Sequence, residues 1–331
     1  MNAREVLDYY KKRETTVIKS IREIVEIESP SHDAEASRKV ADWVETAARA
    51  TGAELSIERI SVADGDHLVI RAFGGRNKPI LLLGHTDTVH PVGTREQNPT
   101  RIEDGKLFGC GIFDMKSGVV LMLEALRFFA ATGTRPPRPI TILLSCDEEV
   151  GSHSGRELVE REARNADVCL VFEPSANGRV KTGRKGTGFY TLHAHGVPSH
   201  AGLEPEKGAN AIAEIARQIP HIHVLENAEI GTTVNVCTMH GGTTTNVIPE
   251  HAQCTIDVRF SSLSEAQRID TAVRKLQPQD SRVSLEIVGD INRPPMERTD
   301  AIVRLFENAR DIAAEFDYEL DERQVGGASD G

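Results

Sequence analysis

The chain has 331 residues, of which 39% are hydrophobic and 27 are glycine, and this composition is typical of globular domains rather than of disordered chains. At roughly 150 residues per domain, the length predicts about two domains. With 39 basic and 50 acidic residues the net charge is −11, which disfavours nucleic acid and anionic membranes as partners.

The N-terminal sequence and the cysteines indicate a cytoplasmic protein. Polar, helix-like sequence follows Met1 directly, and no run of about 18 apolar residues occurs, so neither a secretory signal nor a membrane span is expected. The five cysteines are odd in number, widely spaced and without a C-x-x-C pair, which is typical of reduced thiols.

Up to about residue 178, segments with helical spacing of apolar residues alternate with short runs rich in branched residues. Helices are predicted at residues 5–28, 34–51, 115–131 and 155–164, and strands at residues 55–60, 67–73, 79–83, 139–145 and 167–172. This alternation predicts an α/β layer around a mainly parallel sheet that is covered on both faces.

From about residue 179 the order of elements changes. Strands are predicted at residues 188–195, 232–240, 251–260 and 283–288, and helices at residues 209–219 and 264–275. The order β-α-β-β-α-β is that of a ferredoxin-like sandwich. Because a further helix is predicted at residues 300–316, we expect a domain at residues 179–295, inserted into a first domain made of residues 1–178 and 296–331.

Acidic and imidazole side chains gather where the predicted strands of the first domain end. His85 and Asp87 follow one strand, the Asp-Glu-Glu run at residues 147–149 follows another, and Glu173 follows a third. Asp114 directly precedes an apolar helix. In open α/β sheets, the edge formed by these strand ends is where ligands bind.

Each motif by itself has a plainer interpretation. His85 and Asp87 could form a polar turn, Asp114 could cap its helix, and residues 147–149 could be a solvated acidic turn. Three adjacent carboxylates at the end of an apolar strand, however, raise one another's pKa unless a cation offsets them. Together, one imidazole and several carboxylates without thiolates indicate a catalytic zinc or similar divalent site, with enough ligands for two ions.

The order and spacing of these motifs resemble those of the metallopeptidase family that contains glutamate carboxypeptidase, acetylornithine deacetylase, succinyl-diaminopimelate desuccinylase and aminoacylase-1. The resemblance covers essentially the whole chain. It implies an α/β, zinc-exopeptidase-like catalytic domain with an inserted ferredoxin-like α+β dimerisation domain. It also implies a homodimer with two Zn²⁺ ions per subunit, for which Co²⁺ or Mn²⁺ could substitute.

The same resemblance assigns the metal ligands. His85 and Glu173 would bind the first zinc, Glu149 would bind the second, and Asp114 would bridge the two. These assignments come from matching motif to motif, residue by residue.

The resemblance also assigns the catalytic groups of the first domain. Asp87 would orient His85, and the peptide bond between Asp114 and Met115 would be cis. Glu148 would be the general base, which takes a proton from the attacking water and later delivers it to the leaving amine.

In the second domain, the resemblance points to four residues. His200, supplied by the partner subunit in many members, would help to stabilise the oxyanion. Asn246 and Arg259 would hold the substrate carboxylate, for which the arginine fork is well shaped, and Arg293 is a further candidate. Without the resemblance, His200 would be an ordinary loop histidine, Asn246 a turn former and Arg259 a surface ion-pair residue.

The chain departs from the family pattern at its end. The family's fifth ligand, a histidine on the second zinc, lies beyond the glycine-rich segment that here occupies residues 326–331. The sequence therefore resembles a member that stops before its last strands and helix.

These observations favour a cytoplasmic di-zinc hydrolase that cleaves a peptide or N-acyl amide bond beside a free carboxylate. Its substrate would be a small peptide or an N-acyl amino acid, and the segments around Asn246, Arg259 and Arg293 favour a glutamate-carboxypeptidase-like exopeptidase. Two alternatives stay open: an N-acyl-amino-acid deacylase, and a non-catalytic metal-binding dimer if one zinc lacks its last ligand. A phosphate-handling protein is disfavoured because the chain has no G-x-x-x-x-G-K-[ST] motif.

Overall fold

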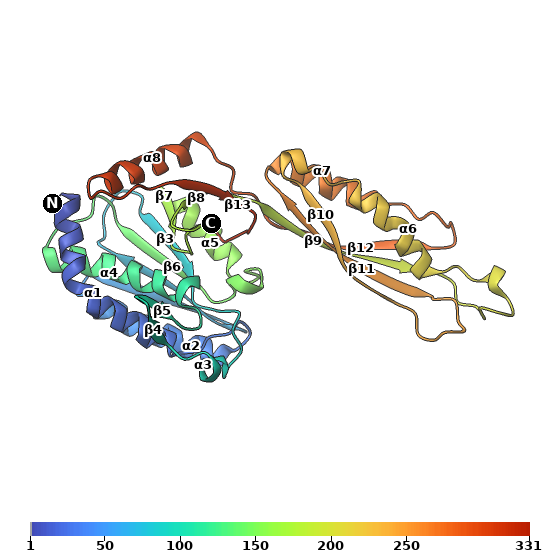
Figure 1. Cartoon of the computed structure of the whole chain (residues 1–331), viewed down its shortest axis with the longest axis horizontal. Coiled ribbons are helices and arrows are strands. Elements are labelled where there is room, and N and C mark those ends of the chain that lie inside the picture. The colour runs from blue at the N-terminus through green and yellow to red at the C-terminus, as the bar shows by residue number, and fades with distance from the viewer. Residues whose placement is uncertain (1) are drawn as a thin grey trace. The chain divides into compact units, whose positions relative to one another are not determined.

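The computed structural model describes residues 2–331, which divide into two compact units (Figure 1). Unit 1 contains the residues up to Asn177 together with Asp311–Glu319 and Asp330–Gly331, and unit 2 contains Gly178–Arg310 and Leu320–Ser329. The division expected from the sequence, at residues 178 and 296, concerns domains and stays a prediction.

Unit 1 is built on a five-stranded sheet with the order β1-β2-β6-β3-β7. Strand β3 runs parallel to β6 and to β7, whereas β2 is antiparallel to both β1 and β6. The sheet is therefore mixed, and the expectation of a mainly parallel sheet was wrong for its β1–β2 half. Only two residues join β1 to β2, and such a link allows a hairpin but no crossover. The strands are β1 (Leu55–Val62), β2 (Gly65–Ala72), β3 (Ile80–His85), β6 (Ile140–Ser145) and β7 (Val168–Val171).

Helices cover both faces of this sheet (Figure 1). Side chains alternate along each strand, so Leu82 and Ile142 pack under α1, α2 and α4, while Leu81 and Leu143 pack with α5 on the other face. Polar caps begin the first two helices: Asn2 forms a capping box with Glu5, and Asp33 accepts from the backbone N–H of Ala36. The helices are α1 (Ala3–Val25), α2 (Ala34–Arg49), α3 (Thr94–Gln97), α4 (Ser117–Thr132) and α5 (Arg156–Asn165).

Unit 2 contains a four-stranded antiparallel sheet with the order β10-β11-β9-β12. Its chain order is β-α-β-β-α-β, as the sequence predicts, and α6 and α7 pack on one face through a core that includes Leu192, Ile215, Ile256 and Ile269. Use of this unit in dimerisation stays a prediction. The elements are β9 (Gly186–His195), α6 (Ala211–His223), β10 (Thr233–Gly241), β11 (His251–Phe260), α7 (Leu263–Arg274) and β12 (Ser284–Arg293).

Several short elements complete the chain. Strand β13 pairs in parallel with β8, so the segment near the C-terminus contains a strand that the sequence analysis missed. Across residues 2–331, no helix has both the length and the apolar character that crossing a bilayer requires. The remaining elements are β4 (Arg101–Glu103), β5 (Lys106–Phe108), β8 (Val180–Arg184), β13 (Glu322–Val325), α8 (Asp300–Ala314) and the short helices η1 (Ile112–Lys116), η2 (Glu148–Val150), η3 (Pro205–Lys207) and η4 (Ala228–Ile230).

Candidate metal centre

The imidazole of His85 is held in one orientation at the end of β3. The side chain is buried, and its Nδ1 lies 3.0 Å from the backbone oxygen and 3.3 Å from Oδ1 of Asp87. Its Nε2 lies 3.1 Å from Oδ1 of Asp114. Burial alone would lower the pKa of His85, but hydrogen bonds with Asp114 and Asp87 outweigh it and raise the pKa well above the usual value.

The loop that carries Asp114 is anchored on both sides by buried residues. The peptide bond between Asp114 and Met115 is cis, as the resemblance implied, and the Met115 side chain packs under β3 at Gly84. Lys116 is also buried, and its Nζ donates to the backbone oxygen of Ile27 at 2.5 Å. Burial lowers the pKa of Lys116 to about 8. These anchors leave the Asp114 carboxylate half exposed beside His85.

Asp87 connects the end of β3 to the loop that follows β6. Its Oδ1 and Oδ2 accept the backbone N–H groups of Glu148 at 3.2 Å and of Glu149 at 3.1 Å, and Oδ2 also accepts the Ser31 hydroxyl at 2.7 Å. Burial would raise the pKa of Asp87, but its hydrogen bond and charge interaction with His85, helped by these donors, hold the pKa below its usual value. One ionised carboxylate thus holds the imidazole of His85 and the backbone of both glutamates.

Three of the expected ligands come together at this place. Single ligand atoms of His85, Asp114 and Glu149 all lie within 4.8 Å of one another, and among residues 2–331 this is the one group of three or more such side chains. Burial raises the pKa of Glu149, and the carboxylates of Asp114, Asp87 and Glu173 raise it further. Crowded carboxylates beside an oriented imidazole suit a divalent cation, which would offset their charge.

Glu148 and Glu173 lie next to this group without belonging to it. Glu148 is only 8% exposed and directly precedes Glu149 in η2. Glu173 follows β7 closely and is near enough to influence the pKa of Glu149. The catalytic role of Glu148 and the ligand role of Glu173 stay predictions.

Two carboxylates that hold the loop after β6 through hydrogen bonds were not predicted in that role from the sequence. Asp147 Oδ2 accepts from the backbone N–H and the hydroxyl of Ser154, and Asp330 accepts from the hydroxyls of Ser145 and Ser152. The predictions from the sequence include no contact for residues 326–331. A sequence signal for Asp330 was available, because this carboxylate follows two glycines, an alanine and a serine. The glycines give the backbone the freedom to turn and bring Asp330 to the sheet.

In unit 2, the structure brings His200 and Asn246 together. His200 forms an isolated β-bridge with Val247, and the backbone N–H of Ala201 donates to the backbone oxygen of Asn246 at 2.9 Å. The His200 Nδ1 accepts from the backbone N–H groups of Gly202 and Leu203, both at 3.1 Å. These two bonds hold the ring of His200, which is exposed.

Arg259 and Arg293 also lie near each other, because both are register partners of Thr187, one from β11 and one from β12. Arg259 makes a two-bond ion pair with Asp257, at 2.8 and 2.7 Å, and its guanidinium lies 5.4 Å from the ring centre of Phe189. In this structure the Arg259 fork therefore holds a carboxylate of its own strand.

The two pairs lie at opposite ends of the sheet in unit 2. Thr187, between the arginines, is eight residues along β9 from His195, beyond which the His200 loop begins. At roughly 3.3 Å per residue, about 26 Å separates these ends. The four predicted residues of unit 2 therefore form two pairs, His200 with Asn246 and Arg259 with Arg293, and the two pairs lie far apart.

Comparison with known proteins settles the family. Residues 81–331 match the model of Peptidase family M20/M25/M40. The chain belongs to this family. It is 30% identical over 272 residues to carboxypeptidase G2 of Pseudomonas sp. (strain RS-16), with 81% of this chain and 65% of that protein covered. It is 31% identical over 283 residues to succinyl-diaminopimelate desuccinylase of Delftia acidovorans, with 79% and 72% covered. The chain thus spans just under two thirds of the length of carboxypeptidase G2.

Solved structures show the mixed α/β fold of M20 peptidases. A tripeptidase from Staphylococcus aureus superposes with a TM-score of 0.75 at 21% identity, covering 96% of this chain and 86% of that one. An M20 family metallo-carboxypeptidase from Sulfolobus solfataricus gives a TM-score of 0.67 at 16% identity, covering 95% and 86%. At these identities the likeness concerns the fold alone.

Proposed function

We propose that this chain is a di-zinc hydrolase that cleaves a peptide or N-acyl amide bond beside a free carboxylate, as a carboxypeptidase does. The observation that carries the proposal is the grouping of His85, Asp114 and Glu149, beside which Asp87 holds the His85 imidazole and the backbone of both glutamates. His85 and Glu173 are proposed for one ion, Glu149 for the other, and Asp114 as the bridge. Membership of family M20/M25/M40 supports this assignment.

The chemistry proposed for these residues divides between binding and proton transfer. Bound zinc supplies a Lewis acid, which polarises the scissile carbonyl and lowers the pKa of water. Glu148 takes a proton from the attacking water and passes it to the leaving amine. Its burial beside the group of three supports this role, since a carboxylate shielded from bulk water keeps its proton transfers within the site.

Arg259 and Arg293 are proposed to bind the free carboxylate of the substrate. Their shared register with Thr187 places the two arginines on β11 and β12, the strands that flank β9 on either side. Arg259 already makes two hydrogen bonds to the carboxylate of Asp257. The substrate carboxylate would replace Asp257 and form the same two bonds with the guanidinium. Asn246 and His200 are proposed to act on the substrate bound by the other subunit of a homodimer, because they lie about 26 Å from the arginines along β9.

A second candidate is an N-acyl-amino-acid deacylase. The observation in its favour is the set of desuccinylase relatives, one of which is 31% identical with 72% of its length covered. Both candidates share the metal centre and the carboxylate beside the cleaved bond. They differ in which side of the amide bond carries the recognised group.

The deciding experiment measures zinc-dependent release of amino acid from dipeptide and N-acyl substrates. We expect Glu148→Gln to abolish release while the zinc content stays at the wild-type value, because Gln keeps the shape but cannot take a proton. Undiminished release in Glu148→Gln would exclude this residue as the base. One ion per chain without any hydrolysis would favour the non-catalytic dimer.

Mixing two inactive variants tests the homodimer. We expect His200→Asn and Arg259→Ala to be inactive alone and to regain activity when unfolded together and refolded. Recovery should reach about a quarter of the wild-type value, since half the dimers would be mixed and each would have one intact site of two. Absence of any recovery, with mixed dimers present, would place His200 and Arg259 outside a shared site.

A further inference from the structure

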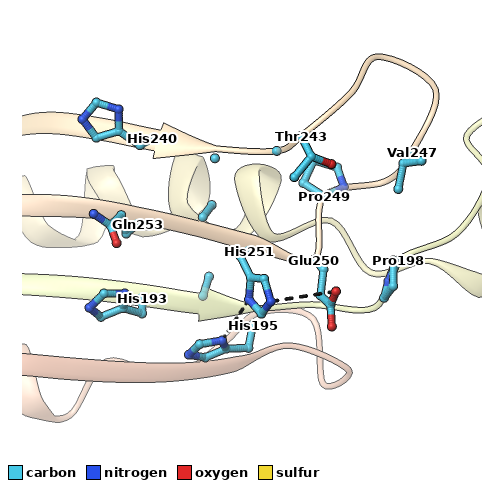
Figure 2. A pocket seen from close by; sticks show the side chains of 14 residues that line it. His193, His195, Pro198, His240, Thr243, Val247, Pro249, Glu250, His251 and Gln253 are labelled. Atoms are coloured by element: carbon cyan, nitrogen blue, oxygen red, sulfur yellow. Dashed lines mark hydrogen bonds and ion pairs between the residues drawn. The ribbon is translucent and has the colours of Figure 1, made fainter.

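Histidines gather on the face of the unit 2 sheet that the helices leave uncovered (Figure 2). His193 and His195 lie two residues apart on β9 and so share this face, and His251 on β11 is the direct register partner of His195. Together with His240 they line a hollow of about 460 Å³. The rings of His195 and His251 meet with their centres 5.3 Å apart. None of these histidines has a role in the proposed hydrolysis.

Two nitrogens in this group face each other at a distance that suits a metal ion. Nδ1 of His195 lies 3.2 Å from Nδ1 of His251. In tetrahedral zinc sites with Zn–N bonds of about 2.0–2.1 Å, two ligand nitrogens are separated by about 3.3 Å. An ion can therefore bind between the two rings with little movement of either strand.

The outer nitrogens of both rings face carboxylates. Nε2 of His195 lies 3.4 Å from Glu286, and Nε2 of His251 lies 3.8 Å from Glu250. Histidines that bind metal through one nitrogen commonly donate the other N–H to a carboxylate, which fixes the tautomer and raises the basicity of the ligand. His195 has such a hydrogen bond, and His251 has a carboxylate close to its Nε2, so the Nε2–H tautomer of both rings would place two lone pairs opposite each other at Nδ1.

We propose that His195 and His251 form a second metal site, which binds a divalent transition ion such as Zn²⁺ through the two Nδ1 atoms. Imidazole ligands select zinc, copper and nickel over magnesium and calcium. The side chains of His195 and His251 are 41% and 67% exposed, so an ion reaches them from solvent. Water fills its remaining positions, and Glu286 and Glu250 offset its charge. This site shares no residue with the group around His85.

Metal analysis of the full chain after dialysis against Zn²⁺ tests the site. We expect wild type to carry one more zinc per chain than His195→Gln or His251→Gln. The matched control is His193→Gln, which removes a histidine from the same face and the same strand; its ring stacks 6.4 Å from that of His195, but it is not one of the two proposed ligands. Glu286→Gln should weaken zinc binding at this site by about 10–100-fold, the usual effect of losing such a carboxylate.

Imidazole nitrogen spectra distinguish a bound ion from a proton shared by the two rings. On addition of Zn²⁺ to wild type, we expect the Nδ1 resonances of His195 and His251 to shift while both rings keep the Nε2–H tautomer. The proposal is overturned if zinc leaves these resonances unchanged, or if His251→Gln retains the wild-type zinc content. Neither outcome depends on hydrolysis, so failure here leaves the proposed function untouched.

Discussion

Asp87 is the carboxylate on which three parts of the metal centre depend, and Asp87→Asn tests that dependence directly. The groups around it are donors: the Ser31 hydroxyl, the backbone N–H groups of Glu148 and Glu149, and Nδ1–H of His85 when Nε2 faces the metal. Asn keeps the size of the side chain but replaces one acceptor oxygen with a donor NH₂. At least one donor then faces another donor.

The expected loss follows from the bonds that change. A hydrogen bond to a charged acceptor contributes about 1.5–3 kcal/mol, and Asn cannot replace the charge that holds His85 in orientation. A loss of about 1.4–2.8 kcal/mol corresponds to about 10–100-fold in affinity, which is also the usual effect of removing a carboxylate that supports a metal-bound histidine. We therefore expect Asp87→Asn to bind Zn²⁺ about 10–100-fold more weakly than wild type.

Competition between the protein and a chelator of known zinc affinity measures this loss, and circular dichroism checks that the variant folds. Asp33→Asn is the matched control. Asp33 caps α2 by accepting from the backbone N–H of Ala36, a task that Asn performs equally well, so its zinc affinity should equal that of wild type. A folded Asp87→Asn protein with wild-type zinc affinity would refute the argument that Asp87 organises the centre.

Three further predictions concern stability. Glu214 is fully buried and accepts two backbone N–H groups, so Glu214→Gln should lower the free energy of unfolding by about 1–3 kcal/mol in urea titrations. Burial holds the pKa of His67 below its usual value; the unfolded chain therefore binds the extra proton, and stability should fall as pH drops through about 6.5. His67→Gln should show a weaker fall between pH 7.5 and 5.5. Gly289→Ala would place a Cβ 2.1 Å from the backbone oxygen of Phe189 at a φ of +113°, so its melting temperature should drop, whereas Gly326→Ala, which meets nothing within 4 Å, should match wild type.

The grouping of His85, Asp114 and Glu149 was predictable because each residue stands next to an apolar element that must be buried. Strands β3 and β6 are parallel neighbours, and their register sets His85 opposite Ser145, shortly before Glu149. Residue type and position beside a buried strand or helix were therefore enough to predict that these three side chains lie together. The hairpin of β1 and β2 also had a sequence signal, Asp64-Gly65, which predicts an antiparallel pair within the sheet that was expected to be mainly parallel.

Other features depend on contacts that no local pattern records. Ser31 reaches Asp87 across 56 residues of sequence, and Asp330 reaches Ser145 across 185. Strands β8 and β13 have five and four residues, too few for an alternating pattern to stand out from a loop. The pairing of Arg259 with Asp257 was one of two interpretations, and only the folded geometry shows that the fork is engaged.

The length of β9 limits how the four unit 2 residues could serve one reaction. A substrate that contacted both Arg259 and His200 of the same chain along the sheet would need to span about 26 Å, which corresponds to about eight residues of extended peptide. The substrates proposed for this chain are dipeptides or N-acyl amino acids, which are far shorter. A small substrate can therefore use both groups only if a second copy of the chain contributes one of them. The homodimer then becomes a requirement of the proposed chemistry rather than an accessory to it, and the mixed-variant experiment tests the two together.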